Sequence, residues 1–213
     1  MKRMEGRRVF LNDVLFVLNA GNTLGWPTLN RTGVQKLLYL CAALSPLAHL
    51  EWGYEFSNAP YGPFNSEIHK ASDTLVYRQL AEFSSVSVQR DSKIRASYRI
   101  TETGISEVQL ICRLIDEEHR FEWITTIMRV LDVYGTSLIT KLAYQEPTFN
   151  WMRKQNKGGA IDLSLAENRS IELIRRMSLG LKEEFSINLD TITSNLILYF
   201  DYLSRGIGET SAS

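Results

Sequence analysis

The sequence of 213 residues has only two cysteines, five prolines and no surplus of either charge. Cys41 and Cys112 stand apart in apolar helical patterns, which is typical of buried thiols in a reducing compartment. Lys plus Arg and Asp plus Glu both number 24, so the chain as a whole has no field that would draw it to an anionic membrane. No apolar run approaches the ~18 residues of a membrane span, and no signal-peptide pattern follows the basic N-terminus. We expect a cytoplasmic protein without a membrane partner.

Sequence motifs that carry catalysis are also missing. There is no Walker A loop, no dinucleotide-binding glycine pattern, no GxSxG nucleophile elbow and no HExxH zinc motif. Asp116 and His119 share one predicted helix face, but a metal would need further ligands from elsewhere in the chain. A solvated, charged helix face explains this pair without a metal. We therefore expect a protein that is not an enzyme, with no catalytic residues, no metal and no cofactor.

What the sequence contains instead is an ordered series of short structural signals after Arg31. An apolar helix begins near this residue, and the alternation of residues 52–56 is typical of a half-buried strand. Residues 60–63 form a forced Pro-Gly-Pro turn, and residues 65–83 follow with the spacing of an amphipathic helix. Asn65 or Ser66 is placed to cap that helix.

From residue 85 onward the sequence predicts a hairpin followed by helices. Residues 85–100 alternate with one apolar and one cationic face, broken at residues 91–93, and Thr101 is placed to cap the next helix. After residue 136 we expect a short helix that ends at Glu146-Pro147, a loop over 148–160 and two further amphipathic helices. The fold class predicted is α+β, mainly α, with a winged helix-turn-helix and its small β-hairpin packed on a C-terminal helical bundle. The domains predicted are 1–104 for the winged helix with its N-terminal helix, 105–205 for the bundle and 206–213 for a flexible tail.

Four phrases carry a resemblance to known proteins: Val34-Gln-Lys-Leu-Leu-Tyr-Leu40, Tyr54-Glu-Phe56, Tyr61-Gly-Pro-Phe64 and Tyr98-Arg-Ile-Thr-Glu-Thr-Gly104. Their combination resembles a loose group of bacterial and phage winged-helix proteins of phage-defence and toxin–antitoxin loci. The group includes the Panacea antitoxin-like proteins and the middle components of three-component defence systems built around an ABC-type or SMC-like ATPase. The resemblance covers residues 31–105 and implies a non-catalytic partner that neutralises a toxin or joins an effector to an ATPase.

The predicted hairpin, or wing, is the candidate DNA-binding surface. Basic residues outnumber acidic ones in residues 1–100, and the reverse holds in residues 101–213. Cationic side chains on a protruding hairpin suit contact with phosphates. The alternative is that Lys and Arg simply blunt an exposed sheet edge. The candidate DNA-binding residues are Arg78, Arg90, Lys93, Arg95 and Arg99.

Three places are candidates for a protein interface. Aromatic rings at the turn of residues 61–64 can face a partner or pack beneath the turn. The predicted loop after residue 148 mixes aromatic and basic residues, which suits a binding surface or a solvated loop with one anchoring tryptophan. The last helices can bury their apolar faces against another subunit or close an internal bundle. The candidate interface residues are Tyr61, Phe64, Phe149, Trp151, Arg153, Lys154, Tyr199 and Phe200.

Two functional hypotheses follow from these surfaces. The leading one is a non-enzymatic adaptor or regulatory subunit of a prokaryotic antiphage-defence or toxin–antitoxin complex. Its partners would be an effector, either a nuclease or a toxin, and an ABC-type or SMC-like ATPase encoded nearby, and its wing would be free to contact DNA. The alternative is a winged-helix transcription regulator that reads an operator as a homodimer.

Overall fold

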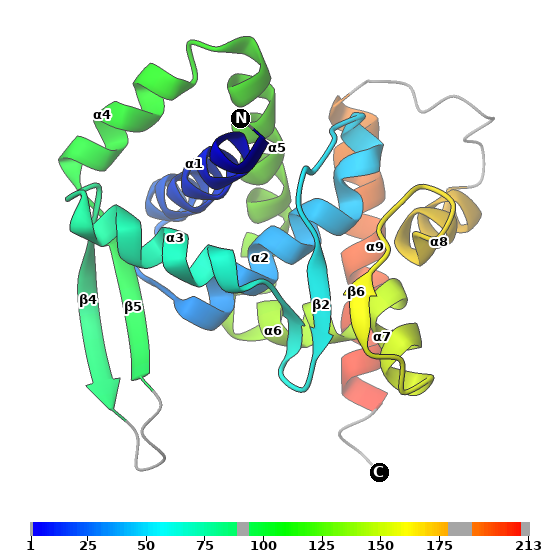
Figure 1. Ribbon diagram of the computed structural model, residues 1–213. Coiled ribbons are helices and arrows are strands. Elements are labelled where there is room, and N and C mark those ends of the chain that lie inside the picture. Colours follow the sequence, from blue (N-terminus) through cyan, green and yellow to red (C-terminus); the bar gives the residue numbers. More distant parts are fainter. Residues whose placement is uncertain (1, 89–93, 179–188, 210–213) are drawn as a thin grey trace. The chain divides into compact units, whose positions relative to one another are not determined.

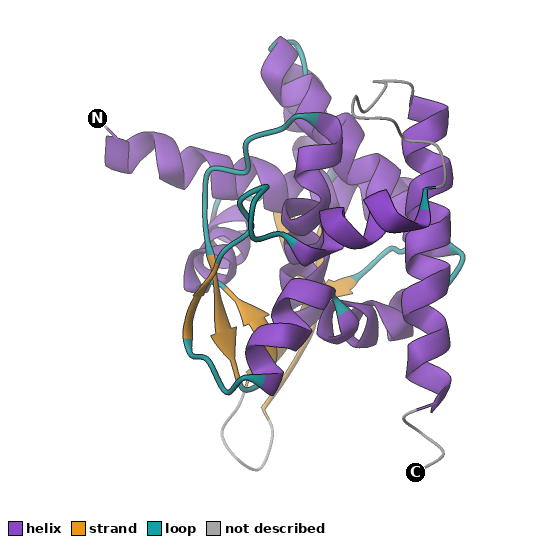
Figure 2. Cartoon of the chain, turned by 90° about the vertical axis from the view of Figure 1, so that its right-hand side faces the viewer, coloured by secondary structure: helices purple, strands orange, loops and turns teal. Residues whose placement is uncertain are grey.

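The computed structural model describes residues 2–88, 94–178 and 189–209 (Figure 1). The protein is α+β and mainly helical, as predicted, and its strands are short (Figure 2). The chain forms two compact units, and each is assembled from two stretches of sequence. Unit 1 comprises Met1–Leu38 and Asn65–Arg129, and unit 2 comprises Tyr39–Phe64 and Val130–Ser213. None of the described helices is both long and apolar enough to cross a membrane.

Unit 1 combines a helical layer with a three-stranded antiparallel sheet of order β1-β5-β4. Helix α1 contacts α3, α4 and β5, so its apolar side chains fill the centre of the unit. Helix α2 begins in unit 1 and continues into unit 2 after Leu38, and α5 also crosses the division. The elements are α1 (Lys2–Thr23), β1 (Leu29–Asn30), α2 (Arg31–Leu44), α3 (Ser66–Tyr77), β4 (Ala81–Val88), β5 (Ile94–Ile100), α4 (Glu102–Ile111) and α5 (Ile115–Asp132).

Both helix caps predicted in this unit are present. The side chain of Asn65 accepts a hydrogen bond of 2.8 Å from the amide of Glu67, and the Thr101 hydroxyl accepts one of 3.1 Å from the amide of Gly104. Gly104 is needed there, because a Cβ atom at this position would lie 2.1 Å from the Leu80 carbonyl oxygen. The first turn of α4 therefore packs directly against the backbone that leads into β4.

The predicted helix over residues 65–83 is wrong in its second part. Helix α3 ends at Tyr77, Gln79 takes a left-handed conformation with φ of 62°, and the chain enters β4 at Ala81. Phe83 is therefore a strand residue, and its ring centroid lies 5.5 Å from that of Tyr98 on β5. The apolar spacing of the two elements runs on without a break, which is why the sequence alone reads them as one helix.

Unit 2 is a helical group with a second three-stranded antiparallel sheet, of order β3-β2-β6. The predicted strand at residues 52–56 lies later in the chain, because β2 begins only at Phe56. The predicted loop over residues 148–160 is also wrong, since most of it forms helix α7 and the start of β6. The elements are the 3-10 helix η1 (Ser45–Ala48), β2 (Phe56–Ala59), β3 (Gly62–Phe64), α6 (Thr136–Gln145), α7 (Pro147–Lys154), β6 (Gly159–Ile161), α8 (Arg169–Met177) and α9 (Leu189–Glu209).

The predicted domain boundary after residue 104 differs from the observed division into units, and packing in unit 2 explains why. The ring of Tyr39 lies 5.2 Å from that of Phe56 and 6.4 Å from that of Phe149, measured between centroids. All three rings are fully buried. Residues 39–64 thus join a core built from the C-terminal half of the chain. The predicted flexible tail of residues 206–213 is wrong for residues 206–209, because helix α9 continues to Glu209. Residues 210–213 lie outside the described part.

A buried ion pair joins α1 to α5 in unit 1. Arg120 donates from Nε to Oδ1 of Asp13 at 2.5 Å and from Nη2 to Oδ2 at 2.7 Å. Asp13 is completely buried, and Arg120 is almost so. A two-pronged guanidinium–carboxylate contact of this kind fixes both the distance and the rotation of the two helices.

Removing one partner of this pair should destabilise the protein strongly. We expect Asp13→Ala to lower the free energy of unfolding by about 3–5 kcal/mol, because it leaves the Arg120 charge buried without its carboxylate. The exposed pair of Asp201 and Arg205 is the control, and Asp201→Ala should cost less than about 1 kcal/mol. Urea denaturation measures both values. Equal losses in the two variants would contradict the expectation.

Candidate interaction surfaces

A polar cluster at the start of α2 joins three elements of unit 1. Arg31 donates from Nε to the Tyr98 hydroxyl at 2.6 Å and from Nη2 to Oδ1 of Asp73 at 2.5 Å. The Tyr98 hydroxyl donates in turn to the same oxygen of Asp73, at 2.8 Å. Burial, opposed by the hydrogen bond from Arg31, raises the pKa of Tyr98 to about 12, so its hydroxyl stays protonated and keeps donating at neutral pH. The cluster holds α3 against the sheet.

Two ion pairs lie among the exposed, described residues of α3 and the β4–β5 hairpin. Lys70 and Glu67 form an ion pair of 2.6 Å on α3. Arg99 pairs with Glu82 at 2.6 Å, because the two residues lie opposite each other in the register of β4 and β5. Acidic partners therefore offset the charges of Lys70 and Arg99 on this surface.

The five candidate DNA-binding residues do not form one patch in the described part of the chain. Arg95 is exposed on β5 without an ion pair among the described residues, whereas Arg99 is paired. Arg78 caps the C-terminal end of α3 and lines a pocket with residues of α1 and α4. Arg90 and Lys93 lie outside the described residues.

Three of the predicted interface aromatics are core side chains of unit 2. Phe149, Tyr199 and Phe200 have no exposed surface, so their rings stabilise the unit instead of facing a partner. The Tyr199 and Phe200 rings contact each other edge to face, with centroids 5.1 Å apart. By contrast, Tyr61 at the β2–β3 turn is 73% exposed, and Phe64 is partly buried.

The side chain that organises unit 2 is the buried carboxylate of Glu146. As the N-cap of α7 it accepts hydrogen bonds from the amides of Thr148 at 3.0 Å and Phe149 at 2.7 Å. The Ser170 hydroxyl donates to its Oε1 at 2.5 Å, and the Tyr39 hydroxyl donates to its Oε2. A carboxylate with four donors is stable without solvent, so α7 begins at a fixed point against α2 and α8.

The network continues to α9 through Ser170. The hydroxyl oxygens of Ser170 and Tyr199 are 2.7 Å apart. Since Ser170 gives its only hydroxyl proton to Glu146, Tyr199 is the donor to Ser170. Burial and the charge of Glu146 raise the pKa of both Tyr39 and Tyr199 well above the usual value, which keeps both hydroxyls protonated.

Helix α8 has an equally specific start. The side-chain oxygen of Asn168 accepts from the amides of Ser170 and Ile171, and its Nδ2 donates to the Ala43 carbonyl oxygen at 2.6 Å. The amide of Arg169 donates to the hydroxyl of Thr148 at 3.1 Å. The first turns of α7 and α8 are therefore bonded to each other and to α2.

These contacts place a cationic, aromatic groove over α7, α8 and α9. Trp151 of α7 lines the groove, with Nζ of Lys157 4.4 Å and Cζ of Arg169 4.2 Å from the ring centroid. Both distances are within the range of cation–π attraction, which holds the two cations beside the ring. Tyr202 of α9, half exposed, also lines the groove. The charged residues of the groove are Lys154, Arg169, Arg176, Arg205 and Glu172.

Four cations and one carboxylate give this groove a positive field, although the whole chain carries no net charge. Arg176 pairs with Glu172 and Arg205 pairs with Asp201, both one helical turn away, while Lys154 is exposed with no ion pair among the described residues. Of the predicted interface residues, Trp151 and Lys154 lie in the groove. Arg153 is exposed, donates to Asn150 and lies over the Tyr144 ring, with Cζ 5.7 Å from the centroid.

Sequence reasoning found Trp151 and Lys154 but missed the buried residues that position the helices of this groove. Glu146-Pro147 reads as a stop for the preceding helix, but proline is also favoured at the first position of a new one, with an acidic cap before it. Asn168 before Arg169 carries a similar signal. No local pattern shows that Tyr39 and Ser170 meet at Glu146, since 107 and 24 residues separate them from it.

Loss of one donor to Glu146 should be measurable as stability. We expect Tyr39→Phe to lower the free energy of unfolding by about 1.5–3 kcal/mol, because a hydrogen bond to a buried charge is lost while the ring packing stays. Tyr144→Phe is the matched control, since the hydrogen bond of 3.4 Å that the Tyr144 hydroxyl donates to the Pro60 carbonyl is exposed, and it should change stability by less than about 0.5 kcal/mol. Urea denaturation with unchanged m-values tests both. A Tyr39→Phe variant as stable as the control would contradict the role of the network.

The two surfaces differ in kind. On α3 and the hairpin, ion pairs neutralise the charges of Lys70 and Arg99. The groove of unit 2 is lined by more basic than acidic side chains, together with aromatic rings. In the described residues no group of three or more His, Cys, Asp or Glu side chains is arranged to hold a metal ion. No protein-family model matches the sequence, and no curated protein matches it significantly.

Proposed function

We propose that the protein is a non-enzymatic interaction subunit of a prokaryotic antiphage-defence or toxin–antitoxin complex, and that it binds an effector or an ATPase partner through the groove of unit 2. The observation that carries the proposal is a groove lined by four cations together with Trp151 and Tyr202, in which Lys154 and Arg169 make no ion pair among the described residues. Arginine and aromatic side chains are enriched at the centres of protein interfaces. The link to defence loci rests on the resemblance of residues 31–105.

The chemistry of the groove selects the kind of partner. Its guanidinium groups bind carboxylates in a planar, two-pronged geometry, and Lys154 adds a point charge. We therefore propose that the partner presents a segment rich in Asp and Glu with an apolar or aromatic residue to contact Trp151. Binding of this type weakens as salt concentration rises.

We also propose that unit 1 is a winged helix. The order α1, β1, α2, α3, β4, β5 with sheet order β1-β5-β4 supports this assignment. In a winged helix α3 is the recognition helix, and the β4–β5 hairpin is the wing. The ion pairs of Lys70 with Glu67 and of Arg99 with Glu82 favour a protein-facing role, because paired cations are less available to phosphates.

Co-expression with the products of the adjacent genes tests the interaction directly. We expect a tagged chain to retain a nuclease, toxin or ATPase, with the mass of the complex read by native mass spectrometry. Lys154→Glu should reduce retention at least tenfold, since it reverses an exposed charge inside the groove. Lys141→Glu is the matched control, because Lys141 is exposed on α6 outside the groove and makes the same change of charge. Equal retention by the two variants would refute the groove as the docking site.

A DNA-binding transcription regulator is the second candidate, favoured by the exposed position of Arg95 on β5. In that case replacing Arg95 and Arg99 together with Glu should abolish binding to promoter DNA of the protein's own operon in an electrophoretic shift. Arg113 and Arg129, exposed elsewhere in unit 1, give a control of equal charge change when both are replaced with Glu. A shift that survives in the hairpin variant would exclude the hairpin as the DNA reader.

A further inference from the structure

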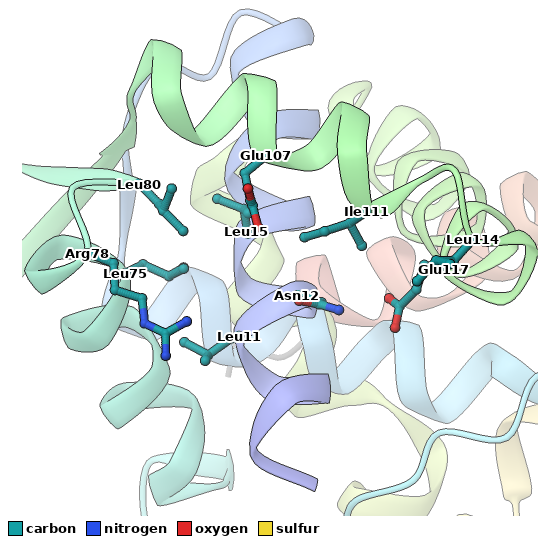
Figure 3. Close-up of a pocket in the computed structure, with 10 residues that line it drawn as sticks. All are labelled: Leu11, Asn12, Leu15, Leu75, Arg78, Leu80, Glu107, Ile111, Leu114 and Glu117. Carbon is teal, nitrogen blue, oxygen red and sulfur yellow. The ribbon is translucent and has the colours of Figure 1, made fainter. Parts of the chain in front are cut away.

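Unit 1 contains a pocket between α1, α3, α4 and α5 that neither functional hypothesis uses (Figure 3). Its volume is about 200 Å³, below the roughly 300–1,000 Å³ of sites for drug-sized ligands and cofactors. A pocket of this size fits a single amino-acid side chain or a small amine. Six aliphatic side chains form most of its wall: Leu11, Leu15, Leu75, Leu80, Ile111 and Leu114.

Two carboxylates lie in this otherwise aliphatic wall. Glu107 extends from α4 toward Leu15, and Glu117 of α5 lies beyond Asn12 (Figure 3). Oε2 of Glu117 is buried and has no hydrogen-bond partner among the described residues. Neither carboxylate makes an ion pair within the described parts of the chain. A buried carboxylate oxygen without a donor costs free energy, and a cationic ligand with N–H groups would remove that cost.

Arg78 is the remaining charged residue of the wall, and it lies on the other side of the pocket. Its guanidinium is beside Leu11, with Asn12 between it and Glu117 (Figure 3). Arg78 is exposed, so solvent screens its charge more than it screens the buried oxygen of Glu117. The pocket therefore has Glu117 at one end and Arg78 at the other, with aliphatic side chains and Glu107 between them (Figure 3).

We propose that this pocket binds an aliphatic chain that ends in an ammonium or guanidinium group, with the chain against Leu15 and Ile111 and the cation at the buried oxygen of Glu117, while the charge of Glu107 on the pocket wall adds to the attraction. The same chemistry belongs to a small alkylamine and to a Lys or Arg side chain inserted by a protein partner. Leu114, 62% exposed at the α4–α5 connection, gives the rim an apolar edge over which such a chain can enter.

Titration with hexylamine tests the proposal, with the methyl signals of Leu15 and Ile111 followed by NMR. We expect a saturable shift with hexylamine and a much weaker one with 1-hexanol or hexanoate, which have the same chain and no cation. Glu117→Gln should raise the dissociation constant at least tenfold, because a charged hydrogen bond is worth about 1.5–3 kcal/mol. Glu107→Gln should act in the same direction.

Arg78→Gln is the control, because it should not weaken hexylamine binding as the Glu→Gln variants do. The removal of a like charge should leave hexylamine binding unchanged or tighter, whereas an anionic ligand would lose its partner. Hexanoate binding as tightly as hexylamine, or hexylamine binding that is insensitive to both Glu→Gln variants, would overturn the proposal. An absence of saturable shifts in the wild-type protein would do the same.

The retention assay with the co-expressed partner distinguishes a partner's Lys or Arg side chain from a small free amine as the natural ligand. If Glu117→Gln weakens hexylamine binding and also reduces partner retention, the natural occupant is a partner's side chain. If retention is unchanged while hexylamine binding weakens, the occupant is a small free cation. Both results support the pocket. They are independent of the unit 2 groove, because Lys154→Glu changes no residue of this pocket.

Discussion

The interaction on which unit 2 depends is the set of hydrogen bonds around the Glu146 carboxylate. A buried charge without partners would be far too costly, but two backbone amides and two hydroxyls satisfy this one. The same group starts α7 and fixes it against α2 and α8. Trp151 and Lys154 follow within two turns, so the geometry of the groove is a direct consequence of this buried cap.

Charge is distributed between the units in a way that total composition hides. In unit 1, Arg31 of α2, Arg120 of α5 and Arg99 of β5 pair with Asp73, Asp13 and Glu82. In unit 2, cations gather along α7, α8 and α9 with fewer acidic neighbours. The equal numbers of acidic and basic residues therefore do not mean an even surface, and local pairing decides which cations are available to a partner.

Local patterns predict the elements of this protein better than its assembly. The caps at Asn65 and Thr101 and the β4–β5 hairpin follow from residue types at fixed spacing, and the structure has them. The end of α3 was missed, because the left-handed turn at Gln79 carries no glycine or proline signal. The division into units was missed for a different reason. It depends on contacts such as Tyr39 with Phe149, which no local pattern encodes.

The interleaving of the two units has a consequence for biosynthesis. At roughly 5–20 residues per second, the 107 residues that separate Tyr39 from Glu146 take about 5–20 seconds to be synthesised. Both stretches of unit 1 precede Glu146 in the chain, so that unit can begin to fold before unit 2 is complete. During this interval the apolar side chains of residues 39–64 lack the C-terminal stretch of unit 2 that buries them. The nascent chain is therefore most exposed to aggregation and to chaperones at residues 39–64, until the C-terminal stretch of unit 2 has been synthesised.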